Sequence, residues 1–367
     1  MQLFLNENTT APLMEREAEA SLSSVLALLA DGGPVETVSL VATKPSIDSA
    51  GAAQLANALR ASAAAAGGGG SVRKLDLSYN DLGPAGATRI AEVLRTDRGI
   101  ATLDLGYNDI CDAGVTAVAE ALRDHNDSCT AVNLYGNRIK GPGVEALVEA
   151  LGAERCAVRE LDISCNGMGV GAAGAAHIAA ALARGAGRNR LEVLYVYGNR
   201  LGAEGAALLA GALRANSALR ELDVSDNGVG AAGATELASA LRANASLQKL
   251  NLGFNAIGPE GAAALEEAVR EANFELREVG GLGNGNGVGE AGREAIEALL
   301  ARNAALAAAR AVRSHMAAFR VHRFWRDVCY DPRFAHARAR LLRIHGGGGS
   351  RRASIFDEAE AAAVLDT

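Results

Sequence analysis

Aromatic residues and prolines are scarce in this sequence. Only 4% of the 367 residues are Phe, Trp or Tyr, although hydrophobic residues make up 49%. Small aliphatic side chains therefore supply most of the apolar volume, which suits many small repeated units better than one large core. Seven prolines against 43 glycines indicate frequent tight turns and exclude a proline-rich disordered chain.

The sequence also lacks metal-binding and redox motifs. Its five cysteines show no CxxC spacing and form no Cys/His set with zinc spacing. In a chain of this length they indicate reduced, mostly buried thiols of an intracellular protein. We therefore expect neither a metal site nor a cofactor.

Long hydrophobic runs are missing as well. No stretch reaches the roughly 18 uncharged apolar residues that a membrane span needs. The first residues, Met1 to Asn6, contain no basic region and too short an apolar run for a signal peptide. These absences predict a cytoplasmic protein with no stable membrane insertion.

The charge is unevenly distributed along the chain. The net charge is −7, yet residues 302–345 contain ten arginines and two aspartates, a balance of +8 that leaves −15 for the rest. An acidic body argues against nucleic acid as its ligand. The sequence thus predicts an acidic body that binds no nucleic acid, followed by a basic segment.

A repeat of 28 to 33 residues dominates the sequence. The stretch Val72-Arg-Lys-Leu-Asp-Leu-Ser-Tyr-Asn80 aligns with Ile100-Ala-Thr-Leu-Asp-Leu-Gly-Tyr-Asn108. Further repeats begin at Cys129, Val158, Leu191, Leu219, Leu247 and Leu276. One supersecondary unit of this size cannot bury a core alone, so neighbouring repeats must stack.

Each repeat predicts a short strand followed by a helix. In Leu75-Asp76-Leu77 the apolar residues alternate with a polar one, which indicates a strand with one buried face. An asparagine at the strand end can satisfy backbone groups that leave the sheet. A glycine then opens an alanine-rich helix. These asparagines are Asn80, Asn108, Asn137, Asn166, Asn199, Asn227 and Asn255, and the glycines are Gly86, Gly114, Gly143, Gly174, Gly205, Gly233 and Gly261.

The pattern LxxLDLxxNxIGxxGAxxLAxAL resembles the ribonuclease-inhibitor-like class of leucine-rich repeats, over about residues 35–300. The resemblance implies an α/β horseshoe solenoid with parallel strands on the concave face and helices on the convex face. It also implies a non-catalytic scaffold that binds another protein. Two other functions occur on this class of repeat. One is a GTPase-activating protein for a small Ran-like GTPase, although such proteins typically carry an acidic segment after the repeats. The other is a sensor related to NOD-like receptors, although no nucleotide-binding domain precedes these repeats.

Four segments follow from this pattern. Residues 1–34 are expected to cap the solenoid, which spans residues 35–300 in about nine repeats with the first and last degenerate. The glycine run from Gly280 to Gly287 leaves the strand of the last repeat in question. Residues 301–345 form a basic helical segment, with a helix from Ala304 to Tyr330, and residues 346–367 a flexible tail.

Candidate catalytic motifs have a structural explanation. Three stretches match GxGxxG, at Gly169, Gly228 and Gly287, but all fall at the same point of the repeat, where glycine already serves the turn into the helix. His177 has no candidate metal partner three or four residues away, so it reads as a satisfied histidine between helices. No Ser/His/Asp or Cys/His set is apparent. We expect no enzymatic activity.

The predicted concave face gathers tyrosines and acids. Five of the six tyrosines fall on or beside one strip, where acidic side chains between aromatic rings would suit a basic protein partner. In the competing interpretation, aspartate is simply usual at this point of the repeat. The strip is centred on Tyr135, Asp162, Tyr195, Tyr197 and Asp223. The expected partner-binding residues are Asp76, Tyr79, Asp104, Tyr107, Tyr135, Asp162, Tyr195, Tyr197, Asp223 and Phe254.

The basic segment after the repeats has three interpretations. It could cap the last repeat, bind a regulatory protein or acidic lipid through its aromatic residues, or fold back onto the acidic strip. Arg351-Arg-Ala-Ser354 resembles a site for a basophilic kinase, which makes Ser354 a candidate for phosphorylation. The sequence alone leaves these alternatives open.

Overall fold

The computed structural model describes residues 21–32, 35–67, 70–167, 170–184, 190–271 and 273–330, with side chains as far as residue 311. The chain divides into two compact units, Met1–Leu306 and Ala307–Thr367. We call the first the solenoid unit. The flexible tail predicted for residues 346–367, the candidate phosphorylation site Ser354 and most of the predicted capping segment lie outside the described residues.

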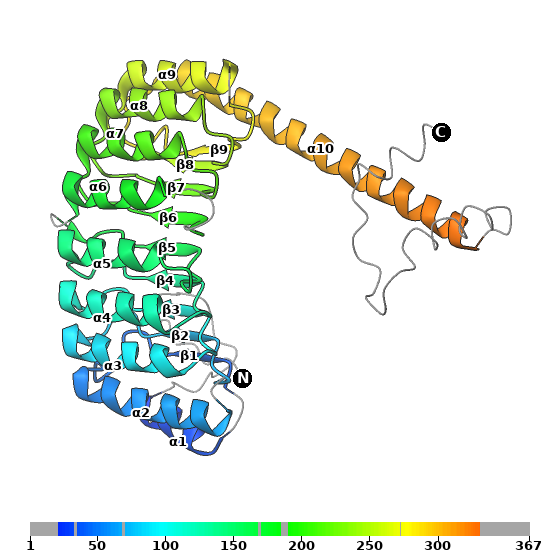
Figure 1. The fold of residues 1–367 in the computed structure, drawn as a ribbon. Coiled ribbons are helices and arrows are strands. Elements are labelled where there is room, and N and C mark those ends of the chain that lie inside the picture. Colours follow the sequence, from blue (N-terminus) through cyan, green and yellow to red (C-terminus); the bar gives the residue numbers. More distant parts are fainter. Residues whose placement is uncertain are drawn as a thin grey trace, which may run out of the picture. The chain divides into compact units, whose positions relative to one another are not determined.

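The solenoid unit contains one parallel sheet in which each strand pairs with the next along the chain (Figure 1). Each repeat takes the number of its strand. The strands are β1 Thr37–Ser39, β2 Lys74–Asp76, β3 Thr102–Asp104, β4 Ala131–Asn133, β5 Glu160–Asp162, β6 Val193–Tyr195, β7 Glu221–Asp223, β8 Lys249–Asn251 and β9 Glu278–Gly280. This arrangement confirms the predicted solenoid of parallel strands.

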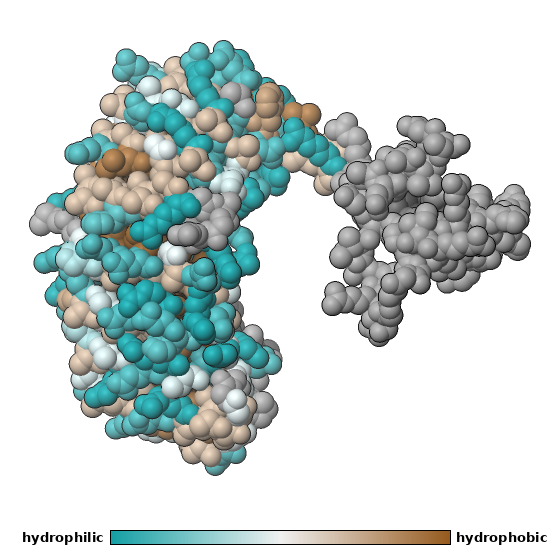
Figure 2. All heavy atoms as spheres, viewed as in Figure 1, coloured by the Kyte–Doolittle hydropathy of each residue, from teal (hydrophilic) through white to brown (hydrophobic). Residues whose placement is uncertain are grey.

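Helices α1 to α9 form a second layer on one side of this sheet (Figure 1). The bounds of the helices are α1 Leu22–Ala30, α2 Ser49–Ala65, α3 Gly83–Thr96, α4 Cys111–Asp124, α5 Gly141–Leu151, α6 Gly171–Leu182, α7 Gly202–Leu213, α8 Gly230–Leu241, α9 Gly258–Glu271 and α10 Glu290–Tyr330. Hydrophilic residues cover much of the face seen in Figure 2. The core therefore lies between the two layers.

Equivalent residues of neighbouring strands pair in register. Leu75 pairs with Leu103, and Asp76 with Asp104. Leu75, Leu77 and Leu103 are fully buried, as the alternating pattern predicts. The last repeat does contain a strand, because Val279 pairs with Leu250. The glycine run begins at the end of this strand, so it shapes the loop that follows and does not prevent pairing.

The strand-end asparagines satisfy backbone groups, as predicted, and the structure shows that they also link successive repeats. The side-chain oxygen of Asn137 accepts hydrogen bonds from the backbone N–H groups of Asn108 (3.0 Å) and Ile110 (3.3 Å), which belong to the preceding repeat. Its amide nitrogen donates to the carbonyl of Leu105 at 2.8 Å. The side chain of Asn137 is fully buried. One residue thus satisfies several backbone groups that have left the sheet.

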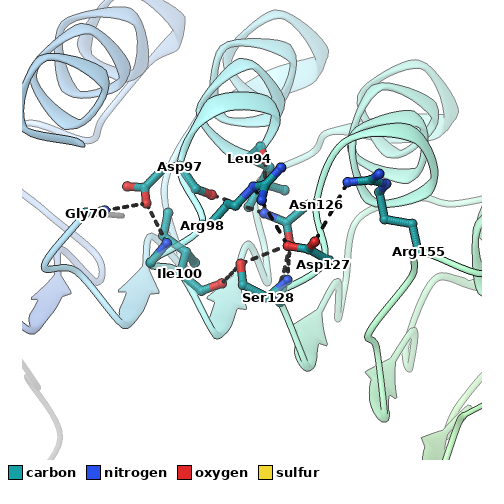
Figure 3. Close-up of polar contacts among 11 residues, drawn as sticks. Gly70, Leu94, Asp97, Arg98, Ile100, Asn126, Asp127, Ser128 and Arg155 are labelled. Atoms are coloured by element: carbon teal, nitrogen blue, oxygen red, sulfur yellow. Dashed lines mark hydrogen bonds and ion pairs between the residues drawn. The ribbon is translucent and has the colours of Figure 1, made fainter. Parts of the chain in front are cut away.

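A second polar ladder, not foreseen from the sequence, joins the turns between each helix and the next strand (Figure 3). The side-chain nitrogen of Asn126 donates to the carbonyls of Leu94 (3.0 Å) and Asp97 (3.2 Å), while its oxygen accepts from the N–H of Cys129 at 2.8 Å. The same role falls to Asn216, Asn244 and Asn273. The signal in the sequence is an asparagine three residues before the first apolar residue of a repeat. Repeats 3 and 5 lack this signal, because Asp97 and Arg155 occupy the position of the asparagine.

The repeat glycines allow helices to pack closely and do not open them. Helix α3 begins at Gly83, three residues before the expected Gly86. The glycines with positive φ at these helix starts include Gly83, Gly202 and Gly230. A Cβ added to Gly114 would lie 2.9 Å from the Cβ of Ala87 in the preceding helix. The small size of this glycine and alanine therefore allows the two neighbouring helices to pack closely.

Two glycines in α7 test this role within one helix. A Cβ on Gly205 would lie 3.1 Å from that of Ala175, whereas one on Gly211 would meet nothing within 4 Å. We expect Gly205→Ala to lower the free energy of unfolding by about 1–3 kcal/mol through overpacking. Gly211→Ala should raise it by about 0.5–1 kcal/mol, because alanine favours helix. Urea denaturation of both variants measures this, and equal effects would contradict the packing role.

The helix expected from Ala304 begins earlier. Helix α10 runs without a break from Glu290 to Tyr330, across the predicted boundary at residue 301. Asn303 donates to the carbonyls of Asn273 (3.0 Å) and Leu276 (2.8 Å), as a ladder asparagine does. However, its oxygen accepts from the Arg302 guanidinium at 3.0 Å, where Asn126 accepts from its own turn. The chain therefore stays helical at Asn303, although the equivalent asparagines of other repeats lie in a turn.

Candidate binding surface

The concave strip consists of the outward residues on the strand side of the solenoid unit. Asp76, Asp104, Asp162, Tyr195 and Asp223 occupy the same position in five strands and are in register. Tyr135 and Tyr197 lie two residues after that position in their repeats, and Tyr79, Tyr107 and Phe254 lie three residues after it. All ten predicted residues thus face the strand side or its rim.

Three tyrosines from consecutive repeats form a stack. The ring centroids of Tyr79 and Tyr107 are 4.4 Å apart with planes at 29°, and those of Tyr107 and Tyr135 are 4.9 Å apart at 54°. Tyr79 remains 55% exposed and Tyr107 40%. We call these three residues the tyrosine stack. It presents a continuous aromatic surface to solvent.

Cys165 extends the stack towards the next tyrosine. The pKa of Tyr135 is raised, first by burial and then by a hydrogen bond with the Cys165 side chain. The pKa of Tyr197 is also raised, chiefly by the charge of the same cysteine. Cys165 was not among the predicted site residues. Its position, one residue before a strand-end asparagine like Tyr79 and Tyr107, was the available signal.

Tyr195 belongs to a different group of contacts. Its hydroxyl donates to a carboxylate oxygen of Glu221 at 3.1 Å, and the other oxygen of Glu221 lies 3.2 Å from the Lys249 ammonium. Burial raises the pKa of Tyr195, and Glu221 raises it further. The structure therefore separates Tyr195 from the tyrosine stack, although both lie on the concave strip.

The aromatic residues at the rim have an unusual backbone conformation. Tyr79 (φ 58°), Tyr107 (φ 52°) and Phe254 (φ 58°) adopt the left-handed region that favours glycine. In repeats 4 and 6 the same position is glycine, Gly136 and Gly198, both at φ 68°. The fold would thus accept glycine where these rings stand. Ala42, Cys165 and Asp226 adopt the same conformation at this position of their repeats, so the turn requires it whatever side chain is present.

The aspartates of the concave strip have a structural role. Asp76 accepts hydrogen bonds from the N–H (3.2 Å) and hydroxyl (2.8 Å) of Ser78, and Asp162 accepts from the N–H of Ser164 at 2.8 Å. Asn133 accepts from the N–H of Tyr135 in the same way, at 2.9 Å. These contacts agree with the interpretation that aspartate is usual at this point of the repeat. Burial raises the pKa of both Asp104 and Asp162.

A polar hollow of about 120 Å³ lies over β7, β8 and β9. It exists because Gly280 has no side chain where the preceding strands carry Asp223 and Asn251. The polar residues that line it are Glu221, Asp223, Lys249, Asn251 and Glu278. The sequence analysis missed this hollow, for which the glycine at the outward position of β9 was the signal.

The GxGxxG stretch at Gly228 takes a structural role, and Gly169 of another such stretch lies outside the described residues. Gly228 and Gly230 have positive φ, while a Cβ on Gly233 would lie 2.9 Å from that of Ala206, so this motif forms a turn and a helix contact. His177 is half-buried on α6. Among the described residues, no cluster of three or more His, Cys, Asp or Glu side chains could hold a metal ion. In the same part of the chain, no helix is long and apolar enough to cross a membrane.

Comparisons with known proteins agree on the repeat. The leucine-rich-repeat family profile matches residues 71–91, 101–119, 215–238 and 243–265. No curated protein matches the sequence. Similar solved structures include the leucine-rich-repeat protein LegL7 from Legionella pneumophila, at 18% identity and a TM-score of 0.46, covering 76% of this chain and 89% of that one. Another is the actin-binding site 2 of leiomodin-1, at 16% identity and a TM-score of 0.39, covering 56% of this chain and 96% of that one. A third is the tropomodulin C-terminal domain of Caenorhabditis elegans, at 16% identity and a TM-score of 0.36, with coverages of 54% and 98%.

The nine-stranded parallel sheet, its helical layer and the family matches define a repeat solenoid. The chain contains leucine-rich repeats. This fold typically serves as a scaffold for protein interaction and is typically not catalytic.

Proposed function

We propose that this protein is a non-catalytic scaffold that binds a protein partner on the concave strip, with the tyrosine stack at the centre of the contact. The observation that carries the proposal is the exposure of stacked rings at positions where the backbone favours glycine. Neither strand pairing nor the core requires an aromatic residue there. Tyrosine combines a large apolar surface with a polar tip and is enriched at interfaces.

The charges beside the stack support a basic partner. Asp76 and Asp104 lie in register on neighbouring strands, and the Asp76 charge contributes to the raised pKa of Asp104. A lysine or arginine of the partner would relieve this repulsion, and a guanidinium could also lie against a tyrosine ring. Because these aspartates already hold turns, we assign them to orientation and association rate, and the rings to affinity.

Affinity capture with the full-length protein tests the proposal. Tyr79→Ala should remove the main captured protein, because interface tyrosines often contribute 2 kcal/mol or more, roughly thirtyfold in affinity. Leu208→Ala is the matched control, since Leu208 is also an exposed apolar residue (37%) but lies on helix α7. Capture should also weaken between low and high salt. Equal capture by the two variants would refute the assignment.

The alternative function as a GTPase-activating protein requires a separate assay. GTP hydrolysis by a panel of small GTPases would be measured with and without the full-length protein. An acceleration that survives Tyr79→Ala would favour that alternative over the proposed scaffold.

A further inference from the structure

The helix layer of the solenoid unit is loosely packed between α5 and α6. An apolar cavity of about 10 Å³, near the lower limit for one water molecule, is lined there by residues of both helices and of β5 and β6. Leu151, which lines the cavity, and Ala179 of α6 are each 8% exposed, whereas the equivalent residues of α4, Leu122 and Ala119, are 3% and 1% exposed. Figure 2 shows apolar residues at the surface in this middle part of the helix layer. We call the contact between α5 and α6 the seam.

Two valines explain the loose packing. In most other helices the residues one and five positions after the repeat glycine are alanines, but in α5 they are Val144 and Val148. A Cβ on Gly174 of α6 would lie 3.6 Å from the Val144 side chain, compared with 2.9 Å between Gly233 and Ala206. The larger side chains keep the two helices apart, and the cavity lies between them. Val115 of α4 is a similar exception, but Ala119 follows it.

A ladder of ion pairs between helices is interrupted at the same place. In several repeats the residue after the last core leucine of a helix is an arginine that pairs with a glutamate of the next helix. These pairs are Arg60–Glu92 (3.6 Å), Arg95–Glu120 (3.2 Å), Arg123–Glu149 (3.4 Å) and Arg214–Glu236 (3.2 Å). Gly152 takes the place of the arginine after α5, and Ala180 takes that of the glutamate in α6. No ion pair joins the described residues of α5 and α6; instead, the Arg184 side chain lies over Gly152.

Helix α6 lacks the arginine as well, since Ala183 follows Leu182. Between α6 and α7, however, the glycine–alanine contact is kept, because a Cβ on Gly205 would lie 3.1 Å from that of Ala175. Among the described junctions from α2 to α9, the missing ion pair and the widened contact therefore coincide only at the seam.

The strand side of the same two repeats is intact. Leu161 of β5 pairs with Leu194 of β6, and the N–H of Asn166 donates to the side-chain oxygen of Asn199 at 3.0 Å. The N–H of Cys165 donates to the carbonyl of Tyr197 at 2.7 Å. A firm strand side and a loose helix side in one repeat pair have the geometry of a hinge.

We propose that the solenoid unit bends at the seam, with β5 and β6 as the hinge, through openings of the helix side that do not require global unfolding. Opening the helix side increases the curvature of the strand side. If the concave strip is the binding face, as proposed above, this motion brings the tyrosine stack closer to Tyr197 and closes the strip on a partner. The seam thus sets the shape of the binding surface.

Hydrogen exchange measured by mass spectrometry on the full-length free protein tests the hinge. Backbone amides of α5 and α6 should exchange at least about tenfold faster than those of α3, α4 and α8, while β5 and β6 remain as protected as the other inner strands. Equal protection from α3 to α8 would overturn the proposal. Because no partner is used, this result is independent of whether the concave strip binds one.

A double variant tests the cause. Val144→Ala with Val148→Ala restores the small residues of the other repeats, so α5 and α6 should approach and exchange at least about threefold more slowly. The matched control is Val115→Ala in α4, where the valine is also fully buried but the ion pair to the next helix is kept; there exchange should quicken, because a cavity is created. Unchanged or faster exchange at the seam in the double variant would refute the explanation that Val144 and Val148 keep the two helices apart.

Discussion

Replacing Tyr107 by glycine should abolish partner capture yet cost less stability than replacing it by alanine. Both changes remove the central ring of the tyrosine stack, so both should weaken binding by about 2–4 kcal/mol, roughly 30- to 1,000-fold. The backbone separates them. At φ 52° an alanine remains strained, whereas a glycine does not. The glycine variant should therefore be more stable by about 1 kcal/mol.

Thermal or urea unfolding of the two variants measures the difference, and capture assays measure the loss of binding. A matched control is available at Gly136, which takes the rim position of repeat 4 at φ 68°. Gly136→Ala should destabilise the protein, since its Cβ would also lie 2.8 Å from the Tyr107 ring. If the alanine and glycine variants at position 107 are equally stable, the strain argument fails. If either retains full capture, the stack is not the contact.

The repeat frame was fully readable from the sequence because it depends on local alternation. Leu75, Asp76 and Leu77 fix which side each residue faces, and the period then places every equivalent residue on the neighbouring strand. Predicting the strip as a row of outward residues required nothing more. Predicting that the tyrosines stack also required the distance between neighbouring strands, which is fixed by parallel pairing.

Features that depend on more distant contacts were harder to predict. Glycine disfavours strands locally, but β9 forms because β8 offers a partner in register, which only the stacked structure reveals. The polar ladder to which Asn126 belongs was not predicted, because Arg155 interrupts the repetition of its asparagines. Arg155 makes an ion pair with Asp127 at 3.7 Å in place of the asparagine contacts. The continuation of α10 past Asn303 depends on Arg302, a single side chain that takes over one hydrogen-bond acceptor.

The structural role of the aspartates follows the same logic. Their outward direction was evident from the alternation, but the hydrogen bond that Asp162 accepts from the N–H of Ser164 depends on backbone geometry after the strand. Charge at the surface therefore cannot be equated with a free binding group. The rim rings differ from the aspartates, because Tyr79 and Tyr107 remain exposed and neither strand pairing nor the core requires them.

Replacing Asn227 by alanine should cause a large loss of stability. The side-chain oxygen of Asn227 accepts from the N–H groups of Asn199 (2.9 Å) and Leu201 (3.3 Å), and its nitrogen donates to the carbonyls of Val196 and Val224, both at 2.9 Å. All of these groups are buried. Alanine leaves them without partners, which costs about 2–4 kcal/mol in the free energy of unfolding.

The loss of stability caused by Asn227→Ala should also be confined to one part of the solenoid unit. In a stack of repeats stability depends on each repeat and on its contact with its neighbours. Asn227 joins repeat 7 to repeat 6, so the loss should fall on that junction and broaden the urea transition as the repeats on either side unfold less cooperatively. Asn284→Ala, in the exposed loop after β9, is the control and should change the unfolding free energy by less than about 0.5 kcal/mol. A loss at Asn227 as small as that of the control would mean that water replaces the asparagine, and the ladder would then not be what holds successive repeats together.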